Sequence, residues 1–231
     1  MKPRQAVFVC AALAGCASTA PNTPPSASTP SAPVSVRYGG GVGVDYRPPA
    51  EHKVVTSRNL ARPATETWTR LRAAAEKSRA LRLESANAKG RTLTLAYRGD
   101  AEPYVDCGVL VARVRDGGEI TSRDFSAASA HERYPLENDK GRYLVDRQMA
   151  LAAKIQVQVG DAGKGRANVR VKAFYTLTKS QFVKREGDAG GDAQEETIHF
   201  DSTHPGAFLV GGREGTRCRA TGQLEQTILN L

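Results

Sequence analysis

Three residues near the end of the chain, His199, Asp201 and His204, have types and a spacing that could bind a metal ion. Residues two apart in a strand project from one face, so the His199 imidazole and the Asp201 carboxylate could lie together, while His204 returns from the next turn. Three such residues within six positions also occur readily by chance, and Pro205–Gly206 marks a surface turn. We therefore keep the three only as candidate metal ligands and expect no metal or cofactor.

Cys107 is a candidate for nucleophilic catalysis, which needs a nearby histidine base and an electropositive setting. Asp106 beside it disfavours a thiolate. Asp100, Glu102 and Asp106 could act as a carboxylate pair, but they flank a proline in an expected loop, where solvated acids are common. The sequence lacks the serine-hydrolase, zinc-protease and nucleotide-loop motifs. We expect a protein that is not an enzyme.

Cys16 follows a basic start, the apolar run Ala6–Leu13 and the small residues Ala14 and Gly15. This order is that of a secretory signal. Leu13–Cys16 resembles the lipobox of bacterial lipoproteins. The resemblance implies cleavage after Gly15, a diacylglycerol on the Cys16 thiol and acylation of the new amino group.

Two other interpretations of this segment exist. The first is a retained transmembrane helix, but the apolar run is far shorter than the roughly 20 residues that such a helix needs. An ordinary signal cleaved after Ala20 would instead release a soluble periplasmic protein and leave Cys16 without a role. In Gram-negative lipoproteins an Asp after the cysteine favours the inner membrane, so by this resemblance Ala17 favours the periplasmic face of the outer membrane.

The export signal changes how the four cysteines are counted. Cys10 leaves with the signal and Cys16 carries lipid. Cys107 and Cys218 remain in the folded part, in an oxidising compartment, where a disulfide between them is expected. Two unpaired buried thiols are the alternative.

The chain is basic: 33 Lys and Arg residues stand against 24 Asp and Glu, a net charge of +9 that falls to +7 when Lys2 and Arg4 leave. Both signs alternate, as in Arg113–Asp116, without a run of five like charges. A basic patch for anionic lipid or cell wall remains an alternative, but a solvated surface explains this pattern better. We expect no nucleic-acid partner.

Residues 16–50, after the signal at 1–15, are expected to form a disordered tether. Seven of the twelve prolines lie between residues 17 and 50, and residues 17–36 carry no charge. Such a segment buries too little apolar surface to offset its ordering entropy. The folded domain is expected at 51–231, with subdomains at about 51–115 and 143–231 as an alternative.

The domain is expected to begin with a strand at Lys53–Ser57 and a helix after Pro63, which suits a first helical turn. Apolar residues then recur at helical spacing, namely Trp68, Leu71, Ala74, Ala75 and Leu81. Two short strands flank a turn at Asn87–Gly90, and residues 116–142 are polar enough to predict a long loop.

The strongest strand signal is the alternation in residues 145–159 and 167–177, where apolar residues occupy odd positions and polar residues such as Gln156 and Gln158 occupy even ones. A glycine-rich connector, Gly160–Arg166, separates the two segments. The pattern predicts a long antiparallel hairpin with one buried and one solvated face.

The remaining residues predict a charged loop at Lys184–Glu196, a short strand around Ile198 and a final helix. Thr221 is expected to cap this helix, whose core-facing residues are predicted to be Leu224, Ile228 and Leu231. The expected fold class is α+β, an antiparallel sheet with a helix near each end of the domain.

The helix, strand, turn and strand between Pro63 and Tyr97, joined to a lipidated cysteine by a Pro-rich tether, resemble the BamC (NlpB) outer-membrane lipoprotein family. The shared apolar skeleton is Trp68, Leu71, Leu93 and Leu95. The resemblance implies a lipidated arm and domains in which a helix packs on an antiparallel sheet. The cysteine pair and the lack of a second copy depart from that family, so we carry over no functional residue.

Together these features predict a non-enzymatic lipoprotein that is anchored to the membrane through Cys16 and binds an envelope protein or supports envelope assembly. The alternative is an envelope-associated binding module for a small ligand or a glycan.

Overall fold

Two long strands that pair along nearly their whole length organise the fold. In the computed structural model, which describes residues 36–37, 42–210 and 213–231, β10 (Gly141–Asp161) and β11 (Ala167–Arg185) form the predicted hairpin. The odd residues of its central part are buried and the even residues face solvent, so the prediction is confirmed. Gly163 and Gly165 in the connector adopt positive φ angles, which a glycine tolerates without strain.

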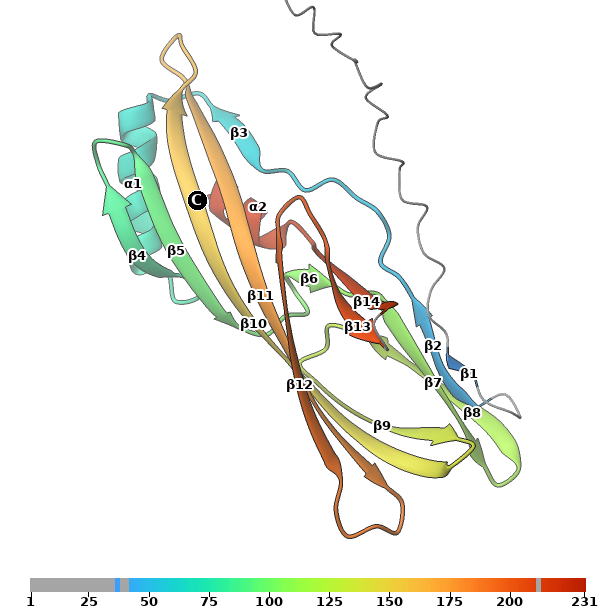
Figure 1. Cartoon of the computed structure of the whole chain (residues 1–231). Helices are drawn as coiled ribbons and strands as arrows, with labels where there is room; N and C mark the ends of the chain where they lie inside the picture. Colours follow the sequence, from blue (N-terminus) through green and yellow to red (C-terminus); the bar gives the residue numbers. More distant parts are fainter. Residues whose placement is uncertain (1–35, 38–41, 211–212) are drawn as a thin grey trace, which may run out of the picture. The chain divides into compact units, whose positions relative to one another are not determined.

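One half of this hairpin belongs to a helix-covered sheet. β5 (Thr92–Gly99) pairs with β10, β4 (Arg82–Asn87) pairs with β5, and β3 (Ser57–Leu60) pairs with β11. The helices α1 (Ala64–Lys77) and α2 (Gln223–Leu229) pack against one side of these strands (Figure 1). Their main core residues are Trp68, Leu71, Ala75, Leu224 and Ile228.

The other half of the hairpin packs on a second sheet. There β9 (His131–Asn138) pairs with β10, and β12 (Asp192–Asp201) pairs with β11. The second sheet has the order β1 (Val36–Arg37), β2 (Gly43–Arg47), β7 (Val109–Asp116) and β8 (Glu119–Ser126). A small core of Ala112, Phe125, Tyr134 and Val145 joins the two sheets.

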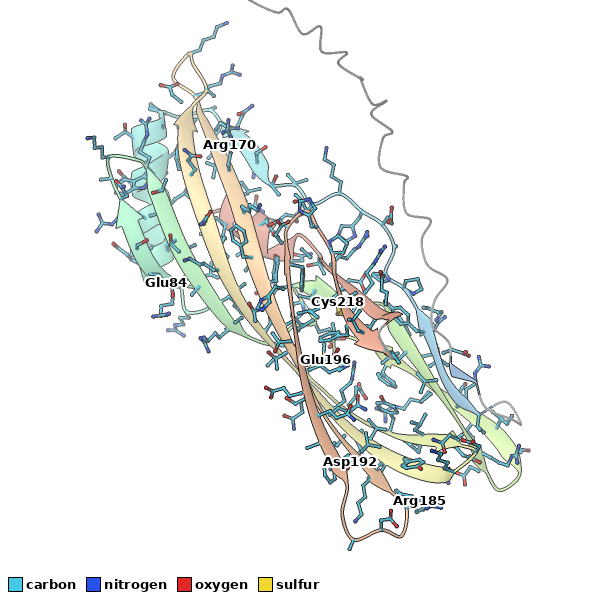
Figure 2. All side chains as sticks on the ribbon, in the orientation of Figure 1. Glu84, Arg170, Arg185, Asp192, Glu196 and Cys218 are labelled. Carbon is cyan, nitrogen blue, oxygen red and sulfur yellow. A yellow bond between two sulfur atoms is a disulfide. The ribbon has the colours of Figure 1, made fainter. Side chains whose placement is uncertain are left out.

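A third, small sheet carries the disulfide. It has the order β13 (Gly206–Val210), β14 (Arg213–Ala220) and β6 (Val105–Asp106). Cys107, next to β6, is bonded to Cys218 in β14, and both residues are fully buried. Figure 2 labels Cys218. The predicted disulfide is therefore confirmed in the structure.

The described chain is mostly antiparallel sheet with two short helices, one early and one at the end, and is compatible with the expected α+β class. It belongs to one compact unit. The helix after Pro63 is confirmed as α1. The final helix is α2, but Thr221 as its cap is wrong, because the N-cap is Gly222 in a left-handed conformation; the Thr221 Oγ1 accepts a hydrogen bond from the Gln223 N–H at 3.3 Å.

Several boundaries differ from the sequence predictions. The loop expected at 116–142 is wrong, because β8 and β9 lie there. Most of β8 is exposed on both faces, and Phe125 is its one buried residue, so β8 has no alternating pattern of buried residues. The boundary expected at residue 50 is wrong, because Gly43–Arg47 forms β2 and pairs with β7. The signal expected at 1–15 and the tether expected at 16–35 lie outside the described residues.

The C-terminal third differs as well. The charged loop expected at Lys184–Glu196 is shorter, because β11 continues to Arg185 and β12 begins at Asp192. The strand expected at Lys53–Ser57 lies instead at Ser57–Leu60 as β3. Leu231, expected in the core, has 46% of its surface exposed.

Candidate interaction surface

Two of the three candidate metal ligands, Asp201 and His204, stabilise a turn. The Asp201 carboxylate accepts hydrogen bonds from the Thr203 N–H and hydroxyl, both at 2.8 Å, and from the His204 N–H at 3.0 Å. His199 instead contacts the Thr176 hydroxyl, at 3.1 Å. The part of the chain that the structure describes has no group of three His, Cys, Asp or Glu residues that could hold a metal ion. The structure thus joins Asp201 and His204 but gives His199 a different partner.

Asp201 is held as a carboxylate. Burial opposes its ionisation, but the hydrogen bonds from Thr203 and the Lys172 ammonium, 3.2 Å away, outweigh burial and lower the pKa of Asp201. A carboxylate with this many donors stabilises the chain reversal between β12 and β13.

The other residues considered for chemistry also have structural roles. Cys107 is in the disulfide and has no thiol to act as a nucleophile. Asp106 and Asp100 each accept a hydrogen bond from a backbone N–H two residues ahead, those of Gly108 and Glu102, at 2.8 and 3.0 Å. Cys16, the predicted lipidation site, lies outside the described residues.

A buried carboxyl group that sequence reasoning missed lies under α2. Glu225 is fully buried, and its Oε1 accepts a hydrogen bond from the Tyr175 hydroxyl at 2.8 Å. The Tyr175 ring stacks on Phe200, with ring centroids 5.1 Å apart. Burial raises the pKa of Tyr175, and Glu225 raises it further, so the hydroxyl keeps the proton that it donates. The pair is closed to solvent and links α2 to the centre of β11.

The side of the main sheet away from the helices is accessible to solvent. We call its central part the open face. It consists of side chains from three adjacent strands, β10, β11 and β12: Ala150, Ala152, Phe174, Thr176, Thr178, Phe182 and Thr197. None of these residues is charged, but the same side of these strands also carries Lys154, opposite Phe174, and Glu195, opposite Ser180. Figure 2 labels Arg170 and Arg185 near the two ends of β11, which runs through this surface.

Register explains why these residues share a surface. Ala150 is paired with Thr178, which is paired with Thr197, and the two threonine hydroxyls are 3.0 Å apart. Phe174 and Phe182 lie eight residues apart on the same face of β11, with 38% and 42% of their surfaces exposed. At about 3.3 Å per residue the two rings are roughly 26 Å apart. The sequence contained a signal for this surface, because the even positions around residues 150 and 176 hold no charged residue.

Two hollows border the open face. One, of about 630 Å³, lies on the helix-covered half and is lined mainly by hydroxyl, amide and cationic side chains, namely Thr92, Thr94, Gln156, Gln158, Arg170 and Lys172. The other, of about 310 Å³, lies near Phe182 and is lined also by Gln148, Ser180 and Glu195. This side thus has an uncharged row at Ala150, Thr178 and Thr197, with charged and polar residues on both sides of the row.

Neither helix of the described chain combines the length and apolar character needed to cross a bilayer. The chain matches no protein-family model, no curated protein and no solved structure.

Proposed function

We propose that this chain is a non-enzymatic lipoprotein, anchored by lipid on Cys16 to the periplasmic face of the outer membrane, whose domain binds an envelope protein through the open face. The anchoring part rests on the lipobox Leu13–Cys16 and on Ala17 after it. The uncharged Pro-rich segment at 17–35 would give the domain reach from the membrane.

The observation that carries the binding proposal is the uncharged row Ala150, Thr178 and Thr197, which with Ala152 and Thr176 lies between exposed Phe174 and Phe182. Protein interfaces have cores depleted of charged residues and enriched in aromatic ones, with polar residues around them. Two exposed phenylalanines on one face of a solvated strand leave apolar area that a partner could bury.

Site-specific crosslinking in intact envelopes tests this proposal. A photoreactive Thr178→p-benzoylphenylalanine variant should form a discrete protein adduct. The same substitution at Thr69, an exposed position on α1, should not. A Phe182→Asp change in the Thr178 variant should lower the adduct yield at least about tenfold, because it places a charge in the apolar part of the interface.

Equal adduct yields at Thr178 and Thr69, or a yield that Phe182→Asp leaves unchanged, would overturn the open face as the binding surface.

A second candidate function, glycan binding, is favoured by the hollow lined with Gln156, Gln158, Thr92 and Thr94, because amides and hydroxyls suit sugar hydroxyl groups. Adducts that a muramidase removes and a protease leaves would support the glycan and contradict the protein partner.

A further inference from the structure

A basic groove opens at the end of β5, which extends three residues beyond the start of its antiparallel neighbour β4. β4 begins at Arg82, opposite Ala96, but β5 continues to Gly99. Residues 97–99 therefore pair with β10 on one side and have no strand from the described residues on the other. The groove at this free edge has a volume of about 630 Å³.

The groove has an apolar floor and a cationic rim. Buried Leu81 and half-buried Leu83, Ala96 and Tyr97 line its floor. Its rim carries three guanidinium groups, those of Arg79, Arg82 and Arg98. The loop after α1 that forms one wall is fixed in place, because the Ser78 Oγ accepts a hydrogen bond from the Leu81 N–H at 3.0 Å.

Two of the three arginines have unused hydrogen-bonding capacity. Arg82 pairs with Glu84, which is labelled on β4 in Figure 2. Arg79 and Arg98 have no side-chain hydrogen bond or ion pair with any residue in the described ranges. The acid that also lines the groove, Glu76, is held by Arg72 at 2.8 Å. The groove therefore presents net positive charge to an incoming group.

The groove lies beside the open face. Arg98 is paired with Ala152, which is paired with Thr176. A segment lying beside residues 97–99 would extend the sheet sideways at the border of the proposed interface. Free backbone groups at a strand edge bind an extended peptide, and alternate side chains of that peptide then face the two sides of the sheet.

We propose that this groove binds an extended, acidic segment of a protein partner, which adds a strand beside β5. Carboxylates on one side of the segment contact Arg79 and Arg98, and apolar side chains on the other lie over Leu83 and Tyr97. This inference deepens the proposed function and rests on its premise that the partner is a protein. A strand is favoured over a lipid phosphate, because only a peptide offers backbone groups to the free edge of β5.

The test uses the full lipidated chain in detergent micelles and a capped hexapeptide that alternates valine and glutamate. Fluorescence anisotropy of the labelled peptide should show saturable binding. The Arg79→Gln/Arg98→Gln variant should weaken binding at least about tenfold, because two charge-assisted hydrogen bonds are lost. The matched control, Arg70→Gln, removes an arginine from the outer face of α1, where it pairs with Glu66, and should leave binding unchanged.

Two further peptides separate strand addition from simple charge attraction. A valine–glutamine peptide should bind at least about tenfold more weakly, because it lacks the carboxylates. A backbone N-methylated valine–glutamate peptide should also bind more weakly, because it cannot pair with β5. Hydrogen exchange at residues 97–99 should slow when the unmodified peptide binds.

Equal binding of the N-methylated peptide, or full competition by vesicles containing phosphatidylglycerol, would overturn strand addition in favour of an anion or lipid site. Binding that the arginine variant leaves unchanged would overturn the groove itself. In either case a Phe182-dependent adduct at Thr178 would still support the open face. Loss of that adduct with intact peptide binding would overturn only the open face.

Discussion

Glu225 places a carboxyl group inside the core. It is fully buried, its Oε1 has one donor, and its Oε2 has no hydrogen-bond partner in the structure. A buried polar group without its partner costs far more than a made hydrogen bond contributes. Tyr175 therefore matters to α2 chiefly because it prevents this cost.

Removing that hydroxyl should lower stability. Tyr175→Phe should reduce the free energy of unfolding by about 1–3 kcal/mol, because Glu225 would be left without a donor. Urea titration followed by the fluorescence of Trp68, the only tryptophan, measures the change. Tyr143→Phe is the matched control: the Tyr143 hydroxyl has no hydrogen-bond partner among the described residues, so its removal should change stability by less than about 0.5 kcal/mol.

A second variant tests the reason given for that loss. Tyr175→Phe/Glu225→Leu removes both members of the pair and should recover most of the lost stability, because no buried polar group remains unpaired. If the double variant is as unstable as Tyr175→Phe, or if Tyr175→Phe is neutral, the cost does not come from an unpaired Glu225.

At the scale of elements, the disulfide joins segments that are far apart in the chain. Cys107 and Cys218 are 111 residues apart and connect the start of β7 to β14, just before α2. The loop between them contains the whole β10–β11 hairpin. A crosslink that closes a loop of this length restricts the unfolded chain strongly.

The disulfide should therefore contribute much of the stability. The Cys107→Ala/Cys218→Ala variant should lose about 2–5 kcal/mol of unfolding free energy in urea titrations. A reductant added during unfolding should bring the parent protein to a similar midpoint and leave the variant unchanged. A parent protein whose unfolding midpoint is insensitive to reductant would contradict this contribution.

Secondary structure was predictable only where one face of an element is buried, because burial produces a regular pattern of apolar residues in the sequence. β10 and β11 were found because one face of each strand is buried, which produces strict alternation. β8 was missed because its first six residues are all exposed, and it is held to β7 by backbone pairing. Backbone hydrogen bonds do not depend on side-chain type, so a strand of this kind has no apolar period to detect.

At the scale of the whole molecule, the proposed function needs a lipid anchor as well as a binding surface. The anchor rests on Cys16, and the disulfide is consistent with an oxidising compartment. Several acyl chains on one cysteine would hold the protein on a membrane far more durably than one chain.

The anchor is tested by Cys16→Ser, which removes the acceptor thiol. This variant should lose metabolic labelling by radioactive palmitate and move from the membrane to the soluble fraction on cell fractionation. Cys10→Ser is the matched control, because Cys10 precedes the expected cleavage site and should leave both readouts unchanged. Membrane retention of Cys16→Ser would refute the lipobox.

The sequence by itself determined the features that depend on local order: α1, the β10–β11 alternation and the pair Cys107 and Cys218. The lipobox stays a prediction. Only the tertiary structure decided which distant residues share a surface. Arg79 and Arg98 line one groove because the end of β5 extends beyond the start of β4. Thr178 lies beside Thr197 because of the register between β11 and β12. Register is set by long-range pairing and packing, so no short window of sequence contains it.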